Sequence, residues 1–63
     1  MTQTTIKIEA ADRRAAINEW RAAADGNRAA ANLCEAAGDH ARTAEHRAAA
    51  TKCLARSTAF DRQ

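Results

Sequence analysis

The residues best suited to chemistry in this chain of 63 residues are its two cysteines and two histidines. Two thiolates and two imidazoles form a common tetrahedral site for zinc. In a helical hairpin that turns near Gly38, however, Cys34 and Cys53 are separated by roughly 15 Å along the axis, and His46 and Cys53 by about 10.5 Å. Neither a metal ion nor an intrachain disulfide spans such distances. We therefore expect no metal site, a small packed Cys34 and an exposed His40; a contact of either thiol with another chain stays open.

The most regular polar feature is an arginine ladder, in which Arg14, Arg21 and Arg28 recur every seven residues. Guanidinium groups at this spacing can bind the phosphates of a nucleic acid or an acidic protein surface. Asp25 follows Arg21 by four residues and precedes Arg28 by three, so local ion pairs should neutralise part of the ladder. We expect a solvated face, with contact to a partner or to phosphates as the alternative.

Catalysis, cofactor binding and membrane insertion are not indicated. The acidic residues are scattered, and two glycines do not build a phosphate-binding loop. A chain this short does not readily enclose a dry pocket of about 300 Å³ or more. No apolar run is long enough to span a membrane. We expect a cytoplasmic protein with reduced thiols that is not an enzyme and needs no cofactor.

The composition predicts a thin core. Nineteen residues are alanine, and large apolar side chains are few. Burying each large side chain is worth roughly 1.5 to 3 kcal/mol, whereas ordering the chain costs about 1.5 kcal/mol per residue. A monomer of this size is therefore marginal, and we expect a homodimer or a bound partner to supply the missing stability. The net charge of +2 is too small for the dense basic patch of an obligate nucleic-acid binder.

A stripe with uninterrupted 4-3 spacing predicts one long helix over residues 10–36. A turn at residues 25–27, which the local composition also suggests, would have no reason to preserve that spacing. Three helices with a turn at residues 25–27 is the alternative. The stripe consists of Arg13, Ile17, Trp20, Ala24, Asn27, Ala31 and Cys34.

Residues 37–39 predict a turn, because Gly38 suits the left-handed position that ends a helix and Asp39 suits the N-cap of the next. A second helix is expected over residues 40–60. Its charged side would carry Arg42, Glu45, Lys52 and Arg56. The opposite, packing side would carry Ala44, Ala48, Thr51, Leu54, Ala55 and Thr58. The longer first helix should overhang by about 10 Å, which leaves residues 10–17 exposed unless another chain covers them.

The expected fold class is all-α: residues 1–63 form a single small domain, an antiparallel helical hairpin that dimerises into a helical bundle. Residues 1–9 alternate in polarity and form either an extended tail or a strand paired across the dimer. Buried Arg13 and Asn27 would be polar in an apolar stripe, and one such Asn can fix the register of two helices. The expected interface residues are Ile17, Trp20, Ala24, Ala31, Cys34 and Leu54.

Two short resemblances bear on the alternatives. The segments Cys34-Glu35, Asp39-His40-Ala41 and 53–56 resemble pieces of the Rop family of dimeric helical hairpins, which implies RNA binding. The leucine-rich core layers of that family are missing. Residues 3–24 resemble the opening of a ribbon-helix-helix repressor, which implies DNA contact through Gln3, Thr5 and Lys7. Its second helix would start after residue 27 and be rich in large apolar residues, whereas residues 27–37 offer mainly alanine.

These observations together favour a regulatory or inhibitory protein that acts by protein–protein contact. A short accessory protein of the kind that phages and plasmids encode fits this description, and its target would be a larger protein. Nucleic-acid binding through the arginine ladder or a paired N-terminal ribbon is the second choice.

Overall fold

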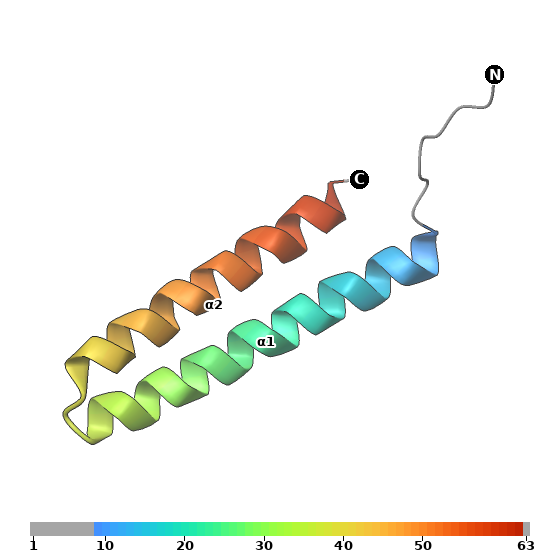
Figure 1. Ribbon diagram of the computed structural model, residues 1–63. Coiled ribbons are helices and arrows are strands. Elements are labelled where there is room, and N and C mark those ends of the chain that lie inside the picture. Colours follow the sequence, from blue (N-terminus) through green and yellow to red (C-terminus); the bar gives the residue numbers. More distant parts are fainter. Residues whose placement is uncertain (1–8, 63) are drawn as a thin grey trace.

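Two long antiparallel helices joined by a short turn form the described part of the chain (Figure 1). The computed structural model describes residues 9–62, with α1 spanning Ala10–Ala36 and α2 spanning His40–Asp61. The predicted helical hairpin is confirmed. Because α1 continues through residues 25–27, the three-helix alternative is wrong. The strand or tail expected over residues 1–9 lies outside the described residues except for Glu9, and neither described helix is long and apolar enough to cross a membrane.

The turn between the helices is fixed by backbone geometry. Gly38 has a φ of 79°, the left-handed conformation that costs glycine little. Its N–H donates to the carbonyl of Glu35, and the N–H of Asp39 donates to the carbonyl of Cys34. This pair of bonds is a Schellman motif, which satisfies the last carbonyls of α1. The Asp39 side chain then accepts from the N–H of Arg42 and caps α2, as its residue type predicts.

The side of α1 that faces α2 follows the 4-3 spacing read from the sequence. Ala24 and Ala31 are buried, with exposed fractions of 0% and 1%. The remaining members of the stripe are half-buried: Arg13, Ile17, Trp20, Asn27 and Cys34.

The side of α2 that faces α1 differs from the predicted one. The residues expected to pack, Ala44, Ala48, Thr51, Ala55 and Thr58, are exposed, and only Leu54 of that set is half-buried. We call the contact between the two helices the seam. The α2 residues that line it instead have 3-4 spacing: Thr43, His46, Ala50, Cys53, Ser57 and Phe60. The prediction was wrong because five of the seven alanines of α2 are exposed, so alanine does not mark the buried side of this helix. Threonine and serine can occupy the seam because their hydroxyl groups donate to nearby backbone carbonyls, that of the N-cap residue Asp39 and that of Leu54.

The expected overhang of α1 is also smaller than predicted. Because α2 continues to Asp61, the two helices differ by five residues, 27 against 22, or about 7.5 Å of length. Asp61 lies beside the first turns of α1, so Arg13 and Ile17 are half-buried rather than exposed.

The two glycines should respond in opposite ways to replacement by alanine. Gly26 lies inside α1, and a Cβ there would meet no atom within 4 Å, so Gly26→Ala should raise the free energy of unfolding by about 0.5 to 1 kcal/mol. Gly38→Ala should lower it by about 1 kcal/mol because of the left-handed backbone. Urea denaturation followed by circular dichroism measures both. Destabilisation by Gly26→Ala at concentrations where the chain is monomeric would contradict a continuous α1.

Candidate functional site

The fully buried side chains of the seam between the two helices are all small. Its centre is a cluster of Ala24, Ala50 and Cys53, against which Trp20 and Leu54 pack from the edges. No large side chain is fully buried among the described residues. Of the six expected interface residues, the structure buries the two alanines, Ala24 and Ala31. It leaves Ile17, Trp20, Cys34 and Leu54 half-buried along the seam.

One layer of the seam is a polar pair. The Nδ1 atom of His46 lies 3.0 Å from Oδ1 of Asn27, and both side chains are half-buried. The amide Nδ2 of Asn27 donates to the carbonyl of Ala23 at 3.0 Å, which leaves Oδ1 as the acceptor. His46 must therefore carry a proton on Nδ1 to donate across the seam. Sequence reasoning identified Asn27 but missed His46, although the 3-4 spacing that starts at Thr43 would have found it.

The buried hydroxyl groups of the seam are satisfied locally. Thr43 Oγ1 donates to the carbonyl of Asp39 at 2.9 Å, and Ser57 Oγ donates to that of Leu54 at 2.8 Å. Within residues 9–62, no buried side-chain nitrogen or oxygen lacks a hydrogen-bond partner. These hydroxyls therefore fill space beside α1 without the cost of an unpaired polar group.

Trp20 lies at the edge of the seam and not at its centre. Its ring packs against the Ala24, Ala50 and Cys53 cluster, and the guanidinium carbon of Arg56 lies 5.3 Å from the ring centroid. This is cation–π distance. The only tryptophan is thus covered on one face by a side chain of α2.

The arginine ladder follows the seam along one flank, where each ladder residue directly follows a seam residue. Arg28 pairs with Asp25 at 3.9 Å, as the spacing predicts. Two turns past the ladder, Glu35 forms an ion pair with Arg47 at 3.4 Å, and the Nδ1 atom of His40 lies 3.5 Å from the same carboxylate.

Arg14 and Arg21 differ from Arg28, because neither lies within ion-pair distance of a carboxylate among the described residues. The ladder is therefore divided into a neutralised part near the turn and a charged part near the open end of the hairpin.

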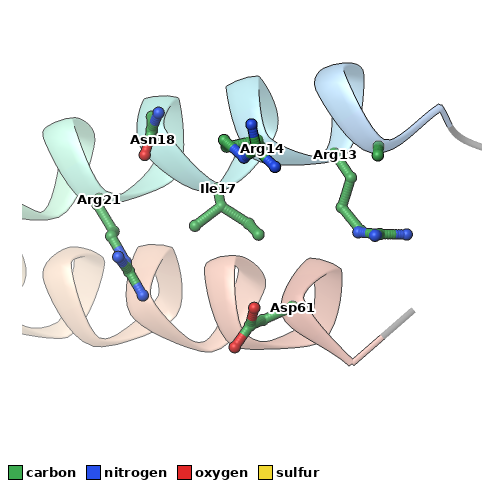
Figure 2. A pocket seen from close by; sticks show the side chains of 7 residues that line it. Arg13, Arg14, Ile17, Asn18, Arg21 and Asp61 are labelled. Carbon is green, nitrogen blue, oxygen red and sulfur yellow. The ribbon is translucent and has the colours of Figure 1, made fainter.

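A hollow of about 280 Å³ lies at this charged, open end, between the first turns of α1 and the last turn of α2. In Figure 2, Ile17 points toward α2, Arg21 reaches across toward α2, and Asp61 lies on the last turn of α2. The lining residues are Ala10, Arg13, Arg14, Ile17, Asn18, Arg21 and Asp61. Sequence reasoning missed this hollow, because it forms only where the ends of the two helices meet.

The opposite flank of α1 carries a second stripe, here called the Leu33 stripe, which consists of Ala23, Gly26, Ala30 and Leu33. Each of these residues directly precedes a seam residue, so the stripe lies away from the arginine ladder. Leu33 is 74% exposed and is the large apolar side chain most open to solvent among the described residues. Its neighbours on the stripe are small, which leaves a smooth surface around it.

The cysteines and histidines are dispersed along the hairpin. Cys53 belongs to the central cluster and Cys34 lies near the turn; both are free thiols. Nowhere in residues 9–62 do three or more histidine, cysteine or acidic side chains come together in a group that could hold a metal ion.

Comparison of the chain with protein-family models, with curated proteins and with solved structures finds no match. The residues of the chain itself are therefore the basis for proposing its function.

The Asn27 and His46 side chains should be energetically coupled. We expect the double mutant Asn27→Ala/His46→Ala to be less destabilised than the sum of the single mutants, by about 0.5 to 1.5 kcal/mol, because each single change leaves a half-buried polar group without its partner. Urea denaturation of the wild type, the two single mutants and the double mutant measures this coupling. Additive effects within about 0.3 kcal/mol would show that the pair does not interact.

Proposed function

We propose that this chain is a small non-enzymatic regulator or inhibitor that acts by protein–protein contact. In this proposal two copies form a homodimeric helical bundle, and the dimer occupies a surface on a larger protein. A short accessory protein of the kind that phages and plasmids encode fits this activity.

One observation supports the proposal most strongly: the hairpin does not bury its own large apolar side chains. The buried side chains are alanine, cysteine, threonine and serine. Ile17, Trp20, Leu54 and Phe60 are each only half-buried, and Leu33 is 74% exposed. Because burial of such side chains is the main source of stability, two helices packed in this way gain substantially when another chain covers them.

The Leu33 stripe is the surface that a second copy would cover. Small residues at helical spacing allow two helix backbones to approach closely, and Gly26 presents no side chain at all. Leu33 would then be the one large apolar side chain to enter the contact. The stripe carries no charged residue, in contrast to the ladder flank.

The dimer is tested by a pair of adjacent substitutions. Leu33→Glu would place a carboxylate in the apolar contact and should weaken dimerisation by about thirtyfold or more. Asn32→Glu adds the same charge one residue away, outside the stripe, and should leave the dimer intact. Light scattering across a micromolar concentration series measures both variants. A wild-type chain that stays monomeric at these concentrations would refute the dimer.

The larger protein partner is tested by capture from the source cell followed by mass spectrometry. The same protein should be enriched by the wild-type chain and by Asn32→Glu, and the purified pair should bind at a defined stoichiometry. Trp20→Ala is a poor negative control, because Trp20 packs against the central cluster and its loss would destabilise the hairpin. If no protein is enriched over a scrambled-sequence bait, the proposed binding to a larger protein is refuted.

Nucleic-acid binding is the second candidate, supported by the guanidinium groups of Arg14 and Arg21, which pair with no carboxylate within residues 9–62, and by Arg13 beside them. With about three phosphate contacts, affinity should fall by roughly fortyfold between 50 and 200 mM salt. An electrophoretic mobility assay with RNA hairpins and DNA duplexes checks this. Absence of any protein–nucleic acid complex at low salt would refute nucleic-acid binding.

A further inference from the structure

We propose that the hollow at the open end of the hairpin binds a short acidic peptide segment of the partner protein, through carboxylates that pair with Arg13, Arg14 and Arg21. This inference rests on the proposed function, in which the chain acts by binding a larger protein. It adds the chemistry of the segment that is recognised.

The charge of the hollow is unbalanced. Three guanidinium groups and one carboxylate, that of Asp61, line it. Within residues 9–62 none of the three arginines lies within 4.0 Å of a carboxylate oxygen, whereas Arg28, Arg42 and Arg47 each do. The hollow therefore holds three cations without a partner in the described structure. Guanidinium groups recognise carboxylates by paired hydrogen bonds.

The position of Arg13 supports a ligand at this place. Arg13 occupies the seam spacing of α1, where the other members are mostly apolar or small, and it is half-buried. In Figure 2 its side chain extends past the end of α2 and toward the open end of the hairpin. A second half-buried residue, Ile17, forms an apolar wall beside it. The site thus combines positive charge with an apolar surface.

This combination fits a peptide better than a nucleic-acid backbone. A phosphate chain needs a continuous row of free cations, but Arg28 is engaged by Asp25 and Arg47 by Glu35. The Asp61 carboxylate in the wall would repel a row of phosphates. No aromatic side chain lines the hollow to stack on bases.

The size of the hollow also suits a short segment. Its volume of about 280 Å³ lies just below the roughly 300 to 1,000 Å³ of small-molecule sites. It can accept one or two side chains of an extended peptide. The Asn18 amide at its edge offers both a donor and an acceptor for the backbone of that peptide.

Fluorescence anisotropy with labelled hexaglutamate at low salt tests the site. Arg21→Gln should weaken binding about fivefold, the upper end for one solvent-exposed ion pair. Arg28→Gln, one heptad away on the same flank, removes the same charge from outside the hollow and should change affinity by less than about twofold. Both side chains are exposed, so both variants should keep the hairpin fold, which circular dichroism checks.

Other results would overturn the proposal. Equal weakening by the two variants would show attraction to net charge alone, and absence of hexaglutamate binding would show that the hollow is not a carboxylate site. Tighter binding of a single-stranded oligonucleotide than of hexaglutamate would assign the hollow to phosphates. A hexaglutamine peptide should not bind. Each of these results leaves the dimer and capture experiments unaffected, so failure of this site is distinguishable from failure of the proposed function.

Discussion

The close contact of two helices through small buried side chains is the constraint on which the rest of this structure depends. Ala24 and Ala50 have only a Cβ, so the backbones of α1 and α2 can approach closely, and between them there is no room for a large side chain. Trp20 and Leu54 must then pack from the edges of the seam. The half-exposure of the larger apolar residues is thus a direct result of the size of the central ones.

The shapes of small side chains do little to fix the register of the two helices, so the register depends on polar contacts. Surfaces of small side chains pack about equally well at several registers. The hydrogen bond between Asn27 and His46, in contrast, forms at only one register of the two helices. The turn contributes the other constraint, because the Schellman motif at Gly38 and the Asp39 cap fix where α1 ends and α2 begins. Orientation and register follow from these few polar groups.

The seam also divides the surface of α1 into two flanks with different chemistry. The flank that follows the seam positions carries the arginine ladder, and the residues that directly precede the seam positions from Ala24 to Cys34 form the uncharged Leu33 stripe. A single helix can in this way present one flank to a second copy and the other to an acidic segment of a partner. Near the turn the ladder flank is neutralised by Asp25 and Glu35, which confines its free positive charge to the open end.

The sequence by itself determined the two helices, the turn at residues 37–39 and the side of α1 that is buried. These depend on local chemistry: a left-handed glycine, an aspartate cap, and a stripe whose spacing includes Ile17 and Trp20, which stand out against alanine. Only the tertiary structure decided the buried side of α2, because most alanines of that helix are exposed and three of its seam residues, Thr43, His46 and Ser57, are polar. It also decided the hollow, since Asp61 and Arg13 are far apart in sequence and meet only through the length and register of the two helices.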